Sequence, residues 1–331
     1  MSLQDSVQEI EDYLKLLQEK LSNPAGLSTD KDYIAFAKAL IPIWMPTYRQ
    51  FEKIASEKPL NQEEINQVRT VLHPLLLNAP FVARAFKKPR GYAGDYEMMN
   101  MILKPAPLGN SPFEKVVHLL NVLPGIPQSV RNRSDRMLSY IQESHQKSSQ
   151  TTRILSLACG PAWELERFLT TQPEGPIEIL LIDHDPEALE FASRQLNQVA
   201  DQHQLDVHVE TAEASLLSLL RYNRSGNAFF KKDYFDLVYS AGIMDYLKDN
   251  ICKELIQYLW QFLRKDGMFF TTNMHPSNPE KAWMNVIFDW PLIYRDFLCF
   301  EQLSPYEHTE VFADDTGINL FMTMKKNNVH E

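Results

Sequence analysis

The clearest pattern along the chain is an alternation of short apolar runs with amphipathic stretches, beginning at Arg153. Ile154–Leu157 and Ile177–Ile182 are apolar runs of strand length. A tight turn at Ala158–Gly160 follows the first run, and the residues after the turn place their apolar side chains at helical spacing. A strand, a helix and a second strand of this length predict a βαβ unit with parallel strands and a right-handed crossover.

The same alternation continues toward the C-terminus. The pattern predicts helices at Glu187–Val199 and Ile251–Leu263, and strands at Leu205–Glu210, Phe235–Tyr239 and Met268–Asn273. Lys265, Asp266 and Gly267 are expected to stop the second helix just before the last of these strands. Two final runs, His308–Phe312 and Ile318–Met324, flank a turn sequence and predict an antiparallel hairpin. The predicted fold class is therefore α/β.

The first 150 residues are expected to be helical. Val7, Ile10, Leu14, Leu17 and Leu21 form one apolar stripe on a polar helix, which ends at Asn23–Gly26. Further helical patterns cover Tyr33–Ile43, Asn61–Leu76, Phe113–Leu123 and Val130–Gln146. The stripe is interpreted as packing within the protein, with pairing between two copies of the chain as the alternative. The polar run His145–Thr152 marks the boundary between a helical domain, 1–148, and an α/β domain, 149–331.

One segment of the helical half has an unusual composition. Residues 87–100, KKPRGYAGDYEMMN, combine two glycines, a proline, two tyrosines and several charges. Pro89 and Gly91 prevent a helix from passing through Arg90, and Asp95 is placed to cap the next helix. The segment is either an interhelical loop with a solvated arginine or a lid in which Arg90, Tyr92 and Tyr96 reach into a neighbouring site.

Composition narrows the functional classes. The chain has 331 residues, of which 44% are hydrophobic, so it can bury an α/β core and a second unit. No apolar run approaches the roughly 18 residues of a membrane span, and the acidic, amphipathic N-terminus does not match a signal peptide. Three scattered cysteines argue against disulfides and against a zinc site, which favours a cytoplasmic protein. A net charge of -10 disfavours nucleic acid as a partner.

The turn at 158–162 and the acid that follows the second strand predict a nucleoside site. In a βαβ unit the ligand lies beyond the carboxyl ends of the strands, and an acid about twenty residues after the turn binds the ribose. Asp183 has that spacing. A single glycine, Gly160, makes a poor pyrophosphate cradle, so the ligand is expected to lack a diphosphate. A bare α/β core without a ligand is the alternative.

The arrangement of five strands with helical crossovers and a closing hairpin resembles the class I S-adenosylmethionine-dependent methyltransferases over residues 130–325. Their seven-stranded sheet has one antiparallel strand near its edge. The first turn, LSLACGPA at 155–162, keeps the Cys-Gly pair of the family pattern L-D-x-G-C-G-x-G and replaces its acid and two glycines. The resemblance implies an S-adenosyl-L-methionine site made by Ala158, Cys159, Gly160, Pro161, Asp183, His184, Glu213, Ser240, Ala241 and Gly242.

A narrower resemblance spans most of the chain beyond residue 80. Four blocks, KPRGYAGDYEMMN, ILSLACGPAWE, FDLVYSAGIMDYL and NPEKAWMNVIFDWPLIYR, are similar to the bacterial methyltransferases that make 3-hydroxypalmitic acid methyl ester, a secreted quorum-sensing signal. In that family the helical N-terminal region belongs to the same protein. The resemblance therefore implies that the helical half acts as a lid and that a fatty acid is the acceptor.

The chemistry of the acceptor decides which side chains are needed. A fatty carboxylate is ionised at neutral pH, so its methylation needs no general base, only groups that orient it and an apolar groove. Candidate orienting groups are Arg90, Tyr92, Tyr96, Tyr294 and Arg295. Candidate groove residues, each of which has core packing as its alternative, are Met98, Met99, Met274, Trp283, Met284, Phe288, Trp290 and Phe297.

Other acceptors need other residues. A hydroxyl or amine acceptor would require a base, for which His275 is the candidate, and a hydrogen-bonded loop histidine is the alternative. Arg133, or its neighbours Arg131 and Arg136, is either the partner of the cofactor carboxylate or part of a solvated helix face. The alternatives to the fatty-acid reaction are O- or N-methylation of another small metabolite, and a binding module that senses the cofactor or a lipid without turnover.

Overall fold

The computed structural model describes residues 1–148, 150–225 and 230–326. These residues form two compact units, the first comprising Met1–Val130 with Asn278–Pro291, and the second Arg131–Ser277 with Leu292–Glu331. This division differs from the expected boundary at 148/149 for two reasons. Helix α7, Gly125–Lys147, passes through the division without a break, and a segment from the second half of the chain folds with the first unit. Ser149, at the expected boundary, lies outside the described residues.

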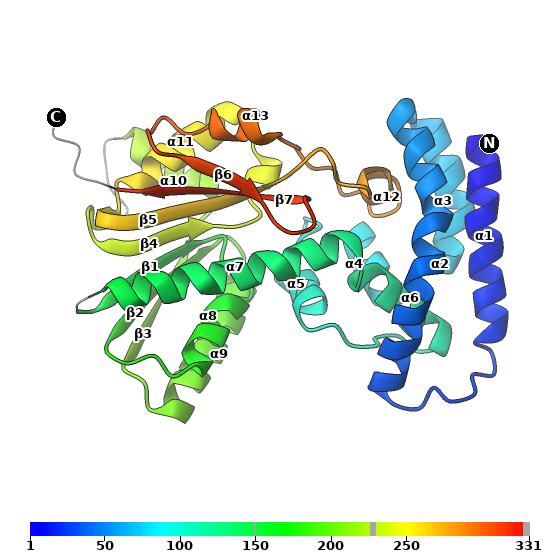
Figure 1. Ribbon diagram of the computed structural model, residues 1–331, viewed down its shortest axis with the longest axis horizontal. Coiled ribbons are helices and arrows are strands. Elements are labelled where there is room, and N and C mark those ends of the chain that lie inside the picture. The colour runs from blue at the N-terminus through cyan, green and yellow to red at the C-terminus, as the bar shows by residue number, and fades with distance from the viewer. Residues whose placement is uncertain (149, 226–229, 327–331) are drawn as a thin grey trace. The chain divides into compact units, whose positions relative to one another are not determined.

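The first unit contains helices and no strand among its described residues (Figure 1). The helices are α1 Leu3–Lys20, α2 Asp30–Glu57, α3 Gln62–Leu76, α4 Pro80–Lys87, α5 Tyr96–Leu103, α6 Pro112–Val122, the start of α7, and α12 Lys281–Val286. Capping boxes at Ser2, Thr29 and Asn61 begin the first three. The stripe of α1 is buried and α1 packs against α2 and α3, which confirms the packing interpretation.

Helix α2 is much longer than the predicted Tyr33–Ile43, because it continues through Pro42 and Pro46. A proline inside a helix removes a backbone hydrogen bond and costs about 3 kcal/mol. Between and after these prolines the helix buries Trp44, Tyr48 and Phe51, each at most 3% exposed. Burial of three aromatic side chains, at roughly 1.5–3 kcal/mol or more each, outweighs the loss.

Segment Asn278–Pro291 docks into the first unit through buried polar contacts. The backbone N–H groups of Ala282 and Trp283, at the start of α12, donate to the carboxylate of Glu52 on α2 over 2.9 and 2.6 Å. Glu280 accepts from the Tyr48 hydroxyl at 2.7 Å and from the Ile126 N–H at 2.9 Å. The indole ring of Trp283 contacts the rings of Trp44, Tyr48 and Phe51. These contacts tie the segment to α2.

The second unit is built on a seven-stranded sheet with the order β3-β2-β1-β4-β5-β7-β6. The strands are β1 Thr152–Leu157, β2 Ile177–Asp183, β3 Val207–Glu213, β4 Phe235–Ser240, β5 Leu263–Met274, β6 Glu310–Ala313 and β7 Asn319–Lys325. Strands β1 to β5 pair in parallel, while β7 runs antiparallel to both β5 and β6. The predicted α/β fold with a closing hairpin and one antiparallel strand near the edge, as in class I methyltransferases, is confirmed.

Helices cover both faces of this sheet (Figure 1). The helices are α8 Trp163–Thr170, α9 Pro186–His203, α10 Leu216–Arg224, η1 Met244–Tyr246, α11 Asp249–Trp260 and α13 Phe297–Glu301. Apolar residues of α7, α8 and α9 pack on one face, and those of α10, α11 and α13 pack on the other. The strand order reverses between β1 and β4, and ligands of open α/β sheets bind at the carboxyl edge of such a switch point.

Two local features differ from the predictions. The tripeptide Lys265–Gly267 lies within β5 instead of before it, and Asp266 has a φ of 62°. The strand keeps this irregular stretch because the Asp266 N–H donates to the Lys326 carbonyl while the Lys326 N–H donates to the Gly267 carbonyl. Helix α10 has no counterpart among the predictions; it is short, with Leu219 and Leu220 as its buried residues.

Candidate functional site

The turn after β1 has a strained backbone. Ala158, Gly160 and Ala162 have φ values of 53°, 52° and 51°, in the left-handed region that alanine rarely adopts. The Cys159 N–H donates to the Ile182 carbonyl at 3.2 Å, which fixes the turn to the end of β2. Among the described residues, nothing lies within 4 Å of a Cβ added at Gly160. The turn therefore faces open space at the switch point, and strain of this kind gathers at ligand sites.

Asp183, at the end of β2, joins the turn as predicted. Its carboxylate accepts from the Gly160 N–H at 3.0 Å and from the Asp185 N–H at 3.1 Å, and the side chain is 6% exposed. The Nδ1 atom of His184 lies 3.1 Å away. Burial alone would raise the pKa of Asp183, but the bonds from His184, Gly160 and Asp185 outweigh burial and lower it. Asp183 is thus an ionised acid beside a glycine turn.

His184 and Glu213 flank this acid. The hydrogen bond to Asp183 raises the pKa of His184, whose side chain is 52% exposed. Glu213 ends β3 and lies opposite Asp183 in the register of the two strands. Its side chain is exposed. Both residues therefore lie at the sheet edge where the resemblance implies the cofactor.

The turn after β4 forms the other wall of the switch point. The Ser240 hydroxyl donates to the Leu157 carbonyl at 2.9 Å and so links β4 to β1. The Gly242 N–H donates to the Thr272 hydroxyl at 3.1 Å, and Gly242 has a φ of 88°. The predicted segment Ser240–Gly242 is therefore held beside the first turn. The Ser240 hydroxyl uses its one proton in this bond, so it has none to donate to a ligand.

Arg133 of α7 reaches this turn. One guanidinium nitrogen lies 2.9 Å from the position that a Cβ on Gly242 would occupy. Burial lowers the pKa of Arg133, and the nearby carboxylates of Asp245 and Glu164 oppose that effect. Of the three arginines considered from the sequence, Arg133 is the one whose guanidinium is recorded against the turn after β4. Arg133 is half-buried, so it does not belong to a fully solvated helix face.

Asp245 and Glu164 were not among the predicted site residues. Asp245, in η1, is 3% exposed and accepts from the Met274 N–H at 2.6 Å. Glu164, in the first turn of α8, is 5% exposed and accepts from the Tyr239 hydroxyl at 2.7 Å. Both acids follow a β-strand by only a few residues, in ILSLACGPAWE and FDLVYSAGIMDYL. An acid just beyond a parallel strand is the signal that could have identified them.

Arg295 has a role that differs from the predicted orienting group. It is 3% exposed, and its five N–H donors are directed to the Asp249 carboxylate, the Asn273 side chain and the Met244 and Leu247 carbonyls. A guanidinium has five donors in all. Arg295 therefore has no donor left to orient an acceptor, and its contacts stabilise the loop after β5.

His275 is a hydrogen-bonded loop residue, which is the alternative given above. Its Nδ1 accepts from the Ser277 N–H at 3.1 Å and lies 2.8 Å from the Ser277 hydroxyl. This arrangement occupies Nδ1 and leaves Nε2 to carry the proton in the neutral ring. Tyr294, in the loop between α12 and α13, is partly buried.

Arg90, Tyr92 and Tyr96 belong to the first unit. The Arg90 guanidinium lies 4.8 Å from the centre of the Tyr96 ring and 3.5 Å from the Glu97 carboxylate. Asp95 caps α5 through the Met98 N–H, as predicted, and pairs with Arg84. Arg90, on the loop before α5, is thus brought against Tyr96, the first residue of α5. Their reach into the site of the second unit stays a prediction.

The candidate groove residues are mostly core residues. Six of the eight are buried: Met98, Met274, Trp283, Met284, Phe288 and Trp290. Met99 is partly buried, and Phe297 is 41% exposed. The burial of these six residues agrees with core packing, which is the alternative to lining a groove.

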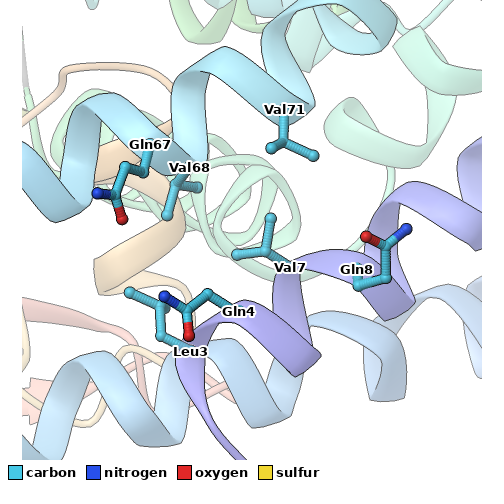
Figure 2. Close-up of a pocket in the computed structure, with 7 residues that line it drawn as sticks. All are labelled: Leu3, Gln4, Val7, Gln8, Gln67, Val68 and Val71. Carbon is cyan, nitrogen blue, oxygen red and sulfur yellow. The ribbon is translucent and has the colours of Figure 1, made fainter.

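A pocket lies between α1 and α3 in the first unit (Figure 2). Its volume is about 180 Å³. The lining residues are Leu3, Gln4, Val7, Gln8, Gln67, Val68 and Val71. None of these side chains is ionisable or nucleophilic, so the pocket offers no groups for catalysis.

In the part of the chain that the structure describes, no helix is both long and apolar enough to cross a membrane.

No family model matches the chain, and no curated protein matches it. A solved structure described as a possible exported protein from Bordetella parapertussis is similar over 88% of this chain and 97% of that one, with 17% identity and a TM-score of 0.58. Magnesium protoporphyrin IX methyltransferase from Synechocystis PCC 6803 with bound SAH matches 62% of this chain and 88% of that one, at 8% identity and a TM-score of 0.45. The 1,6-didemethyltoxoflavin-N1-methyltransferase of Burkholderia thailandensis matches 61% and 82%, at 11% identity and a TM-score of 0.38. At these identities only the first likeness carries weight, and it shows a shared fold.

Proposed function

We propose that this protein is a methyltransferase that uses S-adenosyl-L-methionine. The observation that carries the proposal is the bond between the Asp183 carboxylate and the Gly160 N–H at the switch point of the sheet. It places an ionised acid and an open glycine turn on adjacent strands. This pair suits a nucleoside whose ribose hydroxyls meet the acid while its chain passes the turn.

The described residues fit such a ligand. A carboxylate has about four lone-pair positions. The carboxylate of Asp183 uses positions for Gly160, Asp185 and His184 and keeps capacity for a ribose hydroxyl. The open space at Gly160 admits a ligand close to the backbone. Arg133 provides a cation near Gly242 for the carboxylate of the methionine end.

When bound, S-adenosyl-L-methionine supplies an electrophilic methyl group on a sulfonium. The task of the protein is then to hold donor and acceptor in line and to exclude water. Asp183 fixes the ribose, and the turn after β4 limits how the acceptor approaches. An ionised carboxylate acceptor needs no proton removed, which agrees with the engagement of the His275 Nδ1 in its own loop.

For the acceptor we propose a 3-hydroxy fatty acid, methylated on its carboxylate. The support is the resemblance of four sequence blocks and the contact of Arg90, on the loop between α4 and α5, with Tyr96 at the start of α5. An arginine beside a tyrosine offers both a cation and a hydroxyl donor to a carboxylate. In this proposal the helical unit acts as the lid and supplies those groups.

Cofactor binding is tested first, by isothermal titration calorimetry with S-adenosylhomocysteine. Asp183→Ala is expected to weaken binding by about a hundredfold, since it removes a charged acceptor. Asp206→Ala, an exposed acid at the start of β3, is the matched control and should bind as the wild type does. If the wild-type chain does not bind S-adenosylhomocysteine, the proposed function is wrong.

The acceptor is tested with labelled S-adenosyl-L-methionine and a panel of fatty acids. Label in a base-labile product that extracts into organic solvent supports the ester. Acid-stable label in a polar product supports methylation of another metabolite. Binding of the cofactor with no transfer to any acceptor supports a sensing module instead.

The lid is tested by Arg90→Ala, with Arg49→Ala, an exposed arginine of α2 in the same unit, as the control. Arg90→Ala should retain the affinity for S-adenosylhomocysteine and lose turnover, because the loop acts on the acceptor and not on the cofactor. Turnover equal to that of the wild type would show that the loop plays no such part.

A further inference from the structure

Segment Asn278–Pro291 brings a second buried acid to α2, which already carries one. Its own Glu280 is 8% exposed and accepts from the Tyr48 hydroxyl and the Ile126 N–H. Glu52 of α2 is 7% exposed and accepts two N–H groups from the start of α12. Each carboxylate thus receives N–H groups from the beginning of a helix, Glu280 from α7 and Glu52 from α12. The docked position of the segment depends on both acids.

The two acids also act on each other. Burial raises the pKa of Glu52 to about 7, and repulsion from Glu280 adds to the shift, while Lys281 opposes it. Burial raises the pKa of Glu280 as well, against its bonds from α7 and Tyr48. Arg49 is a further cation in this region, and it acts on Tyr48. Two buried like charges cost more than a proton on either acid, so the docked segment favours protonated carboxyl groups.

The other end of the segment is held by α3 and the end of α4. Arg69 and Lys88 both pair with Asp289. The Nε2 atom of His73 lies 3.1 Å from the Ile287 carbonyl. Burial lowers the pKa of His73, although the bond to Ile287 opposes the shift. Docking at this end therefore favours the neutral imidazole, which is the opposite protonation preference to that of the two acids.

We propose that segment Asn278–Pro291 is a proton-held strap, which docks on α2 while Glu52 and Glu280 carry protons and undocks when both are ionised. Docking takes up protons at these two acids and releases one at His73, so the net exchange is an uptake. A rise in pH therefore favours the undocked strap. The contribution of Glu52 is complete below its undocked pKa near 4.5 and is lost as pH rises through about 7.

The remaining contacts of the strap do not titrate in this range. The Trp283 ring contacts the rings of Trp44, Tyr48 and Phe51. Its indole N–H donates to the Asn121 side chain at 3.2 Å. Burial raises the pKa of Tyr48 further above its usual value, so this hydroxyl stays protonated. These contacts hold the strap equally at each pH, and undocking would expose the aromatic rings that Trp283 covers.

The test is hydrogen–deuterium exchange of the full chain from about pH 5 to about pH 8, with labelling times scaled to the intrinsic exchange rate. Peptides that contain Ala282 and Trp283 report undocking, because their N–H groups donate to Glu52. The ratio of the wild-type opening constant to that of Glu52→Gln should rise about tenfold to a hundredfold over this range. The ratio cancels the contribution of His73, which both proteins share.

Glu57→Gln, at an exposed position of α2, is the matched control and should follow the wild type at every pH. Glu280→Gln should reduce the pH dependence in the same sense as Glu52→Gln. A constant ratio of wild type to Glu52→Gln, or an equal change in peptides of β1 and β4, overturns the proposal. Should neither glutamine variant fold, the wild type decides, because its strap must open at least about tenfold more at the higher pH while the strands do not.

Discussion

At the scale of single residues, Gly242 has a backbone conformation that favours glycine, and its lack of a side chain leaves room for the Arg133 guanidinium. Its φ of 88° favours glycine, and an added Cβ would meet the Arg133 guanidinium at 2.9 Å. Gly175 has the same φ of 88°, yet among the described residues nothing lies within 4 Å of its added Cβ. An alanine at either glycine would strain the backbone similarly, but only an alanine at Gly242 would also displace Arg133.

We expect Gly242→Ala to weaken the binding of S-adenosylhomocysteine by about tenfold or more, because Arg133 must move. Gly175→Ala should leave that affinity unchanged. Both variants carry a similar cost of about 1–2 kcal/mol for a left-handed alanine. Calorimetry and thermal unfolding measure the two effects. Wild-type affinity in Gly242→Ala would show that the position of Arg133 is irrelevant to the ligand.

The contacts of Arg295 predict that replacing this residue lowers the stability of the fold and does not remove a group that contacts the acceptor. Arg295→Ala leaves buried carbonyls and the Asn273 side chain without their donors, so we expect the free energy of unfolding to fall by about 3–5 kcal/mol. Arg295→Lys should recover little, because one ammonium cannot reproduce five donors in a plane. Urea unfolding is the measurement. Arg224→Ala, which breaks an exposed pair with Glu254, is the control and should change stability little.

The residues explain what sequence alone could and could not predict about the site. Gly160 and Asp183 follow from the strand–turn–helix–strand pattern, since the spacing of the acid is set by one βαβ unit. Arg295 could not be assigned, because its donors meet acceptors from β5, η1 and the following loop, which only the tertiary fold brings together. Asp245 and Glu164, by contrast, follow β4 and β1 by a few residues, so their places in the sequence could have identified them.

At the scale of elements, α12 begins against a carboxylate from another helix. Glu52 of α2 accepts the first available N–H groups of α12, from Ala282 and Trp283. Burial raises the pKa of Glu52 to about 7, although these two bonds oppose the shift. The folded state therefore binds a proton more tightly than the unfolded state. Its contribution to stability is largest below the unfolded pKa near 4.5 and is lost as pH rises through about 7.

Glu52→Gln should remove that dependence on pH. The difference in unfolding free energy between wild type and variant is expected to change by on the order of 3 kcal/mol between pH 4.5 and 7, with the wild type losing stability as pH rises. Urea titrations across that range measure it. Glu57→Gln, an exposed position on α2, serves as the control. A constant difference across the range would contradict the burial argument.

Elements with strong periodicity were predictable, and those fixed by tertiary contacts were not. The strands β1, β2 and β4 and the hairpin of β6 and β7 lie where the apolar runs predict them. The part of α2 after Ile43 is not predictable from the pattern, because a proline such as Pro46 normally ends a helix, and here the burial of Tyr48 and Phe51 beyond it offsets that cost. Segment Asn278–Pro291 lies within the expected α/β domain, 149–331, yet it folds with the helical unit.

At the scale of the whole molecule, the chain leaves the second unit after Ser277 and returns at Leu292. The Arg295 N–H donates to the Met274 carbonyl at 3.1 Å, so the two ends of this excursion lie close together. A short Gly-Ser linker can therefore replace Asn278–Pro291 without stretching β5. The replacement removes the indole of Trp283 and the groups that bind Glu52 and Tyr48.

We expect this replacement to loosen the helical unit selectively. Limited proteolysis with mass spectrometry should show new cleavage within residues 1–130, while β1–β7 stay protected, because opening of each region follows its own buried contacts. The same linker placed between Asp315 and Thr316, in the exposed turn before β7, should produce no new cleavage in the helices. New cleavage confined to the strands would show that the segment supports the sheet instead.

The late arrival of this segment has a consequence for the nascent protein. Because Asn278–Pro291 completes a unit that begins at Met1, the ribosome must deliver most of the sheet before Trp283 can reach α2. About 230 residues separate Phe51 from Trp283, so at about 5–20 residues per second the rings of Trp44, Tyr48 and Phe51 are made on the order of tens of seconds before the indole that packs on them. For that interval these apolar rings lack the Trp283 indole that packs against them in the folded protein. The helical unit can therefore be completed only after β5 has been translated.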